Sequence, residues 1–174
     1  GVSWRILFDD LEKIYSGLSE GKVVTLPSKT HSYQQWAKSL KDYASSSSLK
    51  NELPYWQKIV DSTKLLPVDF NNGPATNEFS SEIIVSLTED ETTQLLKNVP
   101  KAYHTEINDI LLTSLVLTLG DWTQDYSLTL SLEGHGREDI VKDIDLSKTI
   151  GWFTSIFPVH LKIVNPQDLG ESIK

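Results

Sequence analysis

The amino-acid sequence predicts an α/β chain in which helices and strands form layers around a mixed sheet. Three observations lead to this prediction. Apolar side chains recur at helical spacing through the first 60 residues, whereas residues 126–133 alternate apolar and polar side chains as a strand does. Between these regions, residues 61–78 contain proline, asparagine and glycine and show little periodicity. This stretch is the best candidate for a connector between two parts of the chain.

The N-terminal part is expected to contain three helices. The first spans residues 4–18, where leucine and isoleucine recur at steps of three and four residues. The second begins at Ser32, because serine readily caps a helix N-terminus. The third follows the serine run 45–48. Pro54 is expected to start that helix or to kink it, because proline lacks the N–H group that an interior helical position donates.

The second part is expected to supply the strands. Alternating patterns predict strands at 79–87, 126–133 and 150–164. Pro158 predicts that the last of these is interrupted or lies at an edge, because proline donates no hydrogen bond to a neighbouring strand. The charged residues 138–148 predict a loop.

Helices are expected between these strands. Thr88 and Glu91 have the spacing of a capping box, which predicts a helix that ends near Lys97. Thr105 is expected to cap a longer helix whose isoleucines and leucines form a broad buried face. Residues 166–174 predict the first turn of another helix.

Composition limits the possible partners. The 174 residues carry 24 acidic and 16 basic side chains, so the formal net charge is −8. This composition argues against nucleic acid as a partner, because no basic excess is present to displace counterions from phosphates. Cysteine is absent, which excludes thiolate metal sites and cysteine nucleophiles and fits a cytoplasmic protein. No apolar run is long enough to span a membrane, and no histidines have metal-ligand spacing.

Glu133 is the candidate acid/base residue. In the alternating stretch that begins at Tyr126, it ends the polar row on the face opposite the leucines, just before Gly134 and Gly136. A carboxylate at a strand end, beside backbone that a ligand can approach closely, suits proton transfer. The alternative is a solvent-exposed carboxylate followed by a tight turn, and spacing alone favours that alternative.

Several segments, in order, resemble the condensation and epimerization domains of nonribosomal peptide synthetases. The chain start resembles the sequence after the family's HHxxxDG motif, with Gly1 as its last letter. EGHGRE and GWFT are the forms typical of epimerization domains. The matching segments are Gly1–Leu7, Ser32–Ala37, Asn108–Leu112, Glu133–Glu138 and Ile150–Pro158.

The resemblance implies the fold of chloramphenicol acetyltransferase, a two-layer α/β sandwich in two lobes with a substrate tunnel between them. Residues 1–68 would complete the first lobe and 69–174 would form most of the second. The chain is thus expected to be a fragment that lacks the histidines of HHxxxDG and the family's last motifs. Alone it is expected to be inactive.

The implied activity is inversion of the Cα centre of an aminoacyl or peptidyl thioester carried on phosphopantetheine. The second histidine of the absent motif and Glu133 would exchange the proton on opposite faces, and Glu133 should be desolvated enough to raise its basicity. No cofactor is expected to bind directly, because the carrier protein supplies the phosphopantetheine. The expected partners are the peptidyl carrier protein and neighbouring synthetase domains.

The resemblance also assigns the other site residues. Ser3 and Trp4 would lie beside the absent histidines, and Ser3 would bond the thioester region or, as the favoured alternative, cap its helix. The segment Gly151, Trp152, Phe153 and Thr154 would line the tunnel, although both aromatic residues are equally compatible with a core. His135 is expected to be structural. Arg137 would pair with a buried carboxylate, such as the aspartate of HHxxxDG.

Two other functions remain open at this point. The chain could belong to a condensation domain that forms the peptide bond, including a form that both condenses and epimerizes. It could instead be a non-catalytic domain that docks carrier proteins or other partners. The EGHGRE and GWFT spellings favour epimerization over condensation.

Overall fold

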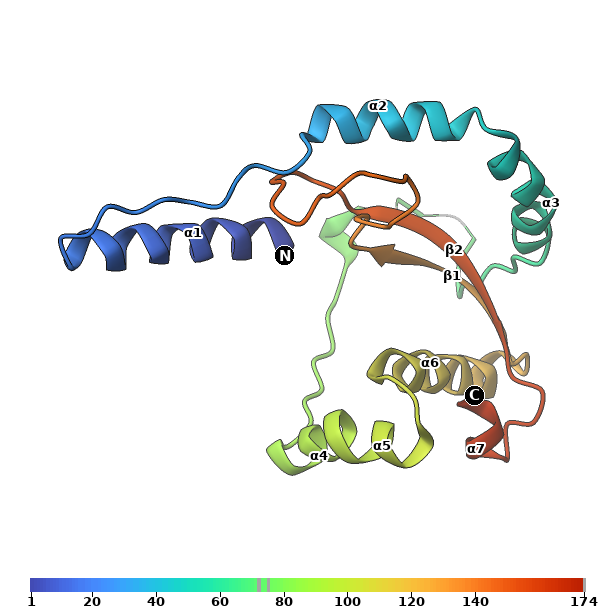
Figure 1. Ribbon diagram of the computed structural model, residues 1–174. Helices are drawn as coiled ribbons and strands as arrows, with labels where there is room; N and C mark the ends of the chain where they lie inside the picture. Colours follow the sequence, from blue (N-terminus) through green and yellow to red (C-terminus); the bar gives the residue numbers. More distant parts are fainter. Residues whose placement is uncertain (72, 75, 174) are drawn as a thin grey trace. The chain divides into compact units, whose positions relative to one another are not determined.

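The computed structural model describes residues 1–71, 73, 74 and 76–173, and combines helices with one two-stranded sheet (Figure 1). The predicted α/β class is confirmed. In chain order the elements are α1 (Val2–Ser19), α2 (Tyr33–Ala44), α3 (Ser47–Asp61), η1 (Asn77–Phe79), α4 (Glu89–Thr93), η2 (Gln94–Asn98), α5 (Val99–Tyr103), α6 (Ile107–Thr123), β1 (Ser127–Gly134), β2 (Ser155–Lys162) and α7 (Leu169–Ser172).

Strands β1 and β2 pair as an antiparallel ribbon. Ile163 donates its backbone N–H to the Tyr126 carbonyl over 2.9 Å, and the Thr129 hydroxyl lies 2.8 Å from Nδ1 of His160 on the same face. In an antiparallel pair, each step forward along β1 corresponds to one step back along β2. By this register Glu133 opposes Ile156.

The chain divides into two compact units. The first comprises Gly1–Asp61 and Ser131–Val159, and the second comprises Ser62–Leu130 and the chain from His160 onward. One half of the β1–β2 ribbon belongs to each unit. The predicted lobes, 1–68 and 69–174, concern the complete family fold and stay a prediction.

The first two helices form where the sequence predicts them. Helix α2 begins after Ser32, whose Oγ accepts the backbone N–H of Gln35 over 3.2 Å. The Gln35 side chain in turn accepts the backbone N–H of Ser32 over 2.8 Å, which completes a capping box. These bonds satisfy two of the N–H groups that the first turn of a helix leaves unpaired.

Helix α3 differs from the prediction. It begins at Ser47, inside the serine run, and continues through Pro54 to Asp61. Because Pro54 lies in the eighth position of the helix, it neither starts the helix nor ends it. The predicted start near Pro54 is therefore wrong, since one missing backbone hydrogen bond does not outweigh the bonds of the turns on either side.

The predicted strand at 79–87 is absent. The backbone from Ser80 to Leu87 has no regular secondary structure, and Ile83 is 91% exposed. A strand needs a neighbour that accepts its N–H groups and donates to its carbonyls. Among the described residues, only β1 and β2 pair in this way. The alternation of apolar and polar residues at 79–87 is therefore not enough to form a strand.

The helices that precede α6 also depart from expectation. The Thr88 capping box is present, but the helical run continues beyond Lys97 through η2, a π-helix, into α5. The widened turn of η2 comes just before Pro100, which cannot donate to the preceding turn. Helix α6 is capped by Glu106 rather than by Thr105, whose buried hydroxyl has no hydrogen-bond partner.

The C-terminal elements are close to expectation. The strand predicted for 126–133 is β1, and the loop 138–148 has no regular helix or strand. The strand predicted for 150–164 is shorter, because residues 150–154 are irregular and only Ser155–Lys162 pair. Asp168 caps the short helix α7.

The first unit has a small core that fixes the loop after β1. Trp36 of α2, Leu146 and Phe153 are buried together, with Leu40, Val141 and Ile144 packed against them. Trp36 of α2 thus packs against two segments that follow it in the sequence by more than 100 residues. In the part of the chain that the structure describes, no helix is both long enough and apolar enough to cross a bilayer.

Replacing Ser32 with alanine should destabilise the fold by about 1 kcal/mol, because one N–H at the start of α2 loses its acceptor. Ser28→Ala is the matched control, since Ser28 is exposed and lies outside the helices; it should change stability by less than about 0.5 kcal/mol. Urea denaturation of both variants measures the difference. Equal stabilities would show that the capping box contributes nothing.

Candidate active site

The residues predicted for the site surround one cavity of about 590 Å³ in the first unit. It lies where the start of α1, the turn after β1 and the segment before β2 come together. The lining includes every predicted site residue except Glu133, namely Ser3, Trp4, His135, Arg137, Gly151, Trp152, Phe153 and Thr154; Gly1, Val2, Leu7 and Ile150 complete it.

Ser3 joins three parts of this cavity. Its hydroxyl donates to the Gly151 carbonyl over 2.8 Å and accepts the Gly151 N–H over 3.1 Å. It also accepts from Nη2 of Arg137 over 3.2 Å. A hydroxyl has one proton and two acceptor sites, so the Ser3 hydroxyl is fully occupied. The prediction that Ser3 caps α1 is wrong, because Gly1 holds that position and Ser3 lies inside the helix.

Arg137 is held by neutral groups. Its Nη1 donates to the Leu146 carbonyl over 2.7 Å, and its guanidinium carbon lies 3.9 Å from the centroid of the Phe153 ring. Burial lowers the pKa of the Arg137 guanidinium, but an arginine keeps its charge in a protein. No carboxylate of the described residues forms an ion pair with Arg137. The expected buried carboxylate partner is therefore not found among them.

His135 shapes the turn between β1 and Arg137. Its Nδ1 accepts the backbone N–H of Arg137 over 3.0 Å. The same atom lies 3.5 Å from a Glu138 carboxylate oxygen, and that contact becomes an ion pair only if Nδ1 is protonated. The bond to the Arg137 N–H is the shorter of the two contacts and uses the lone pair of Nδ1. The arrangement is what a structural role for His135 would require.

Gly136 allows this turn to pass close to the next segment. Its φ of +67° lies in the left-handed region, and a Cβ atom at this position would overlap the carbonyl oxygen of Phe153. Only glycine meets both requirements without strain. The contact brings EGHGRE and GWFT, two motifs separated in sequence by the charged loop, directly against each other.

The GWFT segment separates its two aromatic side chains. Phe153 is buried, with its ring edge-to-face against Tyr33 at a centroid distance of 4.9 Å. Trp152 is 81% exposed and lines the cavity. The two aromatic residues thus differ in burial. Phe153 is a core aromatic that also reaches the cavity wall, whereas Trp152 is not part of the core.

Glu133 lies close in sequence to this cavity but does not line it. Its side chain is exposed on the face of the ribbon that it shares with Ile156, which is 67% exposed. It forms no hydrogen bond or ion pair with any residue that the structure describes. The predicted strand phase is correct, since Ser131 and Glu133 are exposed while Leu132 is partly buried. The described residues therefore do not supply the expected desolvation, because they leave the Glu133 side chain exposed.

Sequence reasoning missed the role of Tyr33. The Tyr33 hydroxyl donates to the Trp152 carbonyl over 2.7 Å, across 119 residues of sequence. The sequence predicts only that Tyr33 follows the Ser32 cap at the start of the second helix. Its position in a segment that resembles a family motif was the available signal, but the bonding partner could not be identified without coordinates.

His31 and His160 also serve as hydrogen-bonding groups. Nδ1 of His31 accepts the backbone N–H of Asp145 over 3.0 Å, and His160 pairs with Thr129. Asp145 also accepts from the backbone N–H of Ser147, which lowers the pKa of the Asp145 carboxyl. Across residues 1–71, 73, 74 and 76–173, no group of three or more metal-ligating side chains is present.

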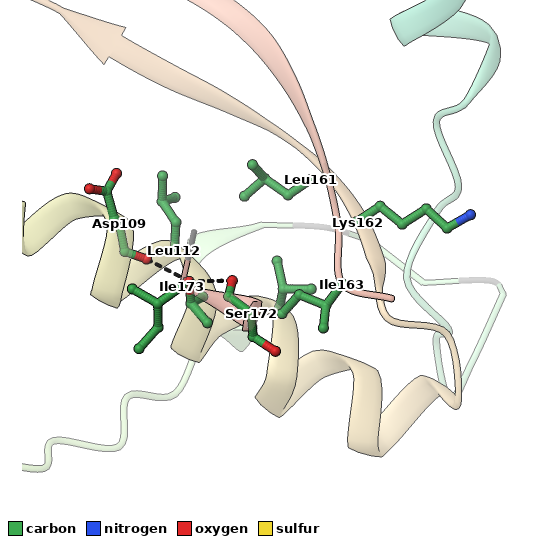
Figure 2. A pocket seen from close by; sticks show the side chains of 9 residues that line it. Asp109, Leu112, Leu161, Lys162, Ile163, Ser172 and Ile173 are labelled. Atoms are coloured by element: carbon green, nitrogen blue, oxygen red, sulfur yellow. Dashed lines mark hydrogen bonds between the residues drawn. The ribbon is translucent and has the colours of Figure 1, made fainter. Parts of the chain in front are cut away.

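The second unit has a separate cavity of about 250 Å³ between α6, the end of β2 and α7. Figure 2 shows Leu112, Leu161, Ile163 and Ile173 around it, with Lys162 extending away from them. None of the predicted site residues lines this cavity. It therefore gives no support to a site in this unit.

Comparison with known proteins identifies the family. A family model described as a condensation domain matches residues 1–174. The chain belongs to the condensation-domain family. Surfactin synthase subunit 1 of Bacillus subtilis (strain 168) is 42% identical over 176 residues, which cover 100% of this chain and 5% of that protein. Tyrocidine synthase 1 of Brevibacillus parabrevis is 40% identical over 176 residues, which cover 100% of this chain and 16% of that protein.

Solved structures confirm the fold of this condensation-domain family member. The epimerization domain from the third module of tyrocidine synthetase B matches with a TM-score of 0.83 and 41% identity, over 99% of this chain and 40% of that one. The first condensation domain of the CDA synthetase matches with a TM-score of 0.74 and 14% identity, over 99% and 37%. The chain thus spans less than half of each domain structure.

Replacing Gly136 with alanine should destabilise the fold by about 2 kcal/mol or more, because the left-handed backbone is strained for alanine and the Phe153 carbonyl must move. Gly73→Ala is the matched control, since no atom lies within 4 Å of a Cβ atom at that position. Thermal unfolding of both variants measures the effect. A Gly136→Ala variant as stable as the control would contradict the close approach of the two motifs.

Proposed function

We propose that this chain is part of an epimerization domain, which interconverts L and D configuration at the Cα of an aminoacyl or peptidyl thioester carried on phosphopantetheine. The observation that carries the proposal is the direct packing of EGHGRE against GWFT around one cavity, through Arg137, Gly136 and Phe153. The level of identity agrees: 41% to an epimerization domain but 14% to a condensation domain, at equal coverage of this chain.

Glu133 is the group of this chain that would move the proton. A thioester acidifies its Cα–H bond because the resulting carbanion delocalises into an enolate, yet the acid remains weak. One base removes the proton from one face, and an acid returns a proton to the other. Glu133 is suited to one of these steps because its carboxylate is engaged by no described residue. The resemblance assigns the other step to the second histidine of HHxxxDG.

The remaining residues would bind and orient the substrate. The GWFT segment, with the exposed ring of Trp152, offers the carrier arm one wall of the cavity. Trp4, which is largely exposed and stacks on Phe8, forms part of the wall from α1. Ser3 has no free proton to donate to the thioester, so its part would be to hold Gly151. The carrier protein would deliver the phosphopantetheine and the synthetase would work in the cytoplasm.

The desolvation that a carboxylate base needs would come from whatever covers the exposed face shared by Glu133 and Ile156. An uncovered carboxylate keeps its hydration and is a weak base at neutral pH. The thioester end of the substrate, extending from the cavity onto this face, would remove water from both residues. On this account Glu133 loses its hydration only when the substrate is bound.

Condensation and non-catalytic docking are the alternatives, and one assay separates the three. The domain that contains this chain is incubated in heavy water with an aminoacyl carrier thioester and no acceptor. Epimerization predicts deuterium at Cα and a mixture of D and L residues. Condensation without epimerization predicts no exchange but a dipeptide once an acceptor thioester is added, and docking predicts neither product.

In that domain, Glu133→Gln should lower the rate of Cα deuterium exchange by about 100-fold or more, because glutamine cannot accept the proton. Asp139→Asn is the matched control, with the same loss of charge at an exposed position in the loop that follows; it should keep the normal rate. Mass spectrometry and chiral chromatography of the released amino acid measure the outcome. Normal D-residue formation by Glu133→Gln would remove Glu133 from the mechanism.

A further inference from the structure

The segment from Thr149 to Phe153 is held at four of its five residues. The buried Thr149 donates its hydroxyl to the His31 carbonyl over 2.5 Å. The backbone N–H and carbonyl of Gly151 both bond to Ser3. The Trp152 carbonyl accepts from Tyr33, and the Phe153 ring is packed in the core. This clamped segment therefore has little freedom left in its backbone.

Tyr33 contributes to this clamp in two ways. Its hydroxyl bonds the Trp152 carbonyl, and its ring packs edge-to-face on Phe153 with an interplanar angle of 78°. The same ring occupies the space beside Gly151, where a Cβ atom would come within 2.5 Å of Cδ2 of Tyr33. Tyr33 thus contacts three consecutive residues of the segment, although its own side chain does not line the cavity.

The clamp leaves the Trp152 side chain as the exposed aromatic group of the segment. A large aromatic side chain on a fixed backbone loses little conformational entropy when a ligand covers it. Trp152 lines the cavity together with Trp4 of α1. The Tyr33 hydroxyl bonds the backbone carbonyl of Trp152, and the Trp152 indole lines the cavity. Tyr33 therefore sets the position of the indole by holding the backbone that carries it.

We propose that Tyr33 is a positioning residue for the carrier-bound substrate, which acts by holding the Trp152 backbone so that the indole forms a fixed wall of the cavity. This inference rests on the proposed function. The Trp152 indole would contact the substrate away from the reacting Cα, so its contacts are the same in the ground state and in the transition state. Loosening it therefore weakens binding of the ground state and of the transition state by the same amount, and the change appears in KM rather than in kcat.

The test is Tyr33→Phe in the domain that contains this chain, with Cα deuterium exchange of an aminoacyl carrier thioester as the assay. Phenylalanine keeps the ring beside Gly151 and Phe153 and removes only the bond to Trp152. KM should rise about fivefold, the effect of one lost hydrogen bond, while kcat stays within about twofold. Tyr55→Phe is the matched control, because Tyr55 is exposed on α3 and lies outside the cavity; both constants should be unchanged.

A purely structural role gives the opposite pattern. Loss of folded protein lowers the concentration of active enzyme, so the apparent kcat falls while KM stays the same. That result, or an unchanged KM with full activity, would overturn the inference. If Tyr33→Phe fails to fold, Ser3→Ala serves in its place, because it frees Gly151 in the same segment and should raise KM likewise.

The outcome for the wild-type domain separates this inference from the proposed function. A wild-type domain that exchanges no Cα deuterium overturns the proposed function, and the inference with it. A wild-type domain that exchanges normally, together with Tyr33→Phe at an unchanged KM, overturns the inference alone. Hydrogen–deuterium exchange of the backbone at 149–153 should also be faster in Tyr33→Phe than in Tyr55→Phe.

Discussion

The hydroxyl of Ser3 is the point at which three distant parts of the chain meet. It connects the first turn of α1 to both backbone groups of Gly151 and to the guanidinium of Arg137. Each of these partners is fixed again elsewhere, Arg137 by the Leu146 carbonyl and the Phe153 ring. Without that hydroxyl, an N–H and a carbonyl at the cavity wall would lack a partner, which is costly in a partly buried place. The position of the cavity wall therefore depends on one small polar group.

Arg137 keeps its charge among neutral partners, and this has an electrostatic consequence. A carbonyl, a hydroxyl and an aromatic face each offer partial negative charge, but none neutralises the guanidinium. The cavity therefore contains a net positive group in a chain whose formal net charge is −8. A carboxylate or a developing enolate nearby would be stabilised by this charge. The favourable interaction grows as water is excluded.

Much of the fold follows from local rules in the sequence, whereas most of the site residues are assigned by the resemblance to a family. Ser32 capped its helix and β1 kept its predicted phase, because both depend on neighbouring residues alone. The residues 79–87 have the same alternation as β1 but form no strand, since pairing requires a partner that no local pattern can specify. Likewise, the alternation of side chains from Tyr126 places Glu133 on the polar face of the strand. Its exposure depends on whether other parts of the protein pack over that face, which the alternation does not specify. The bond from Tyr33 to Trp152 joins residues 119 positions apart and was beyond any local argument.

The turn at Gly136 has a stereochemical consequence of its own. Its backbone conformation is one that D amino acids prefer, and translation supplies only L residues and glycine. Glycine, the achiral residue, is therefore the single translated building block that enters this turn at no steric expense. A side chain of L configuration is thus excluded at this position, because its Cβ atom would overlap the carbonyl oxygen of Phe153.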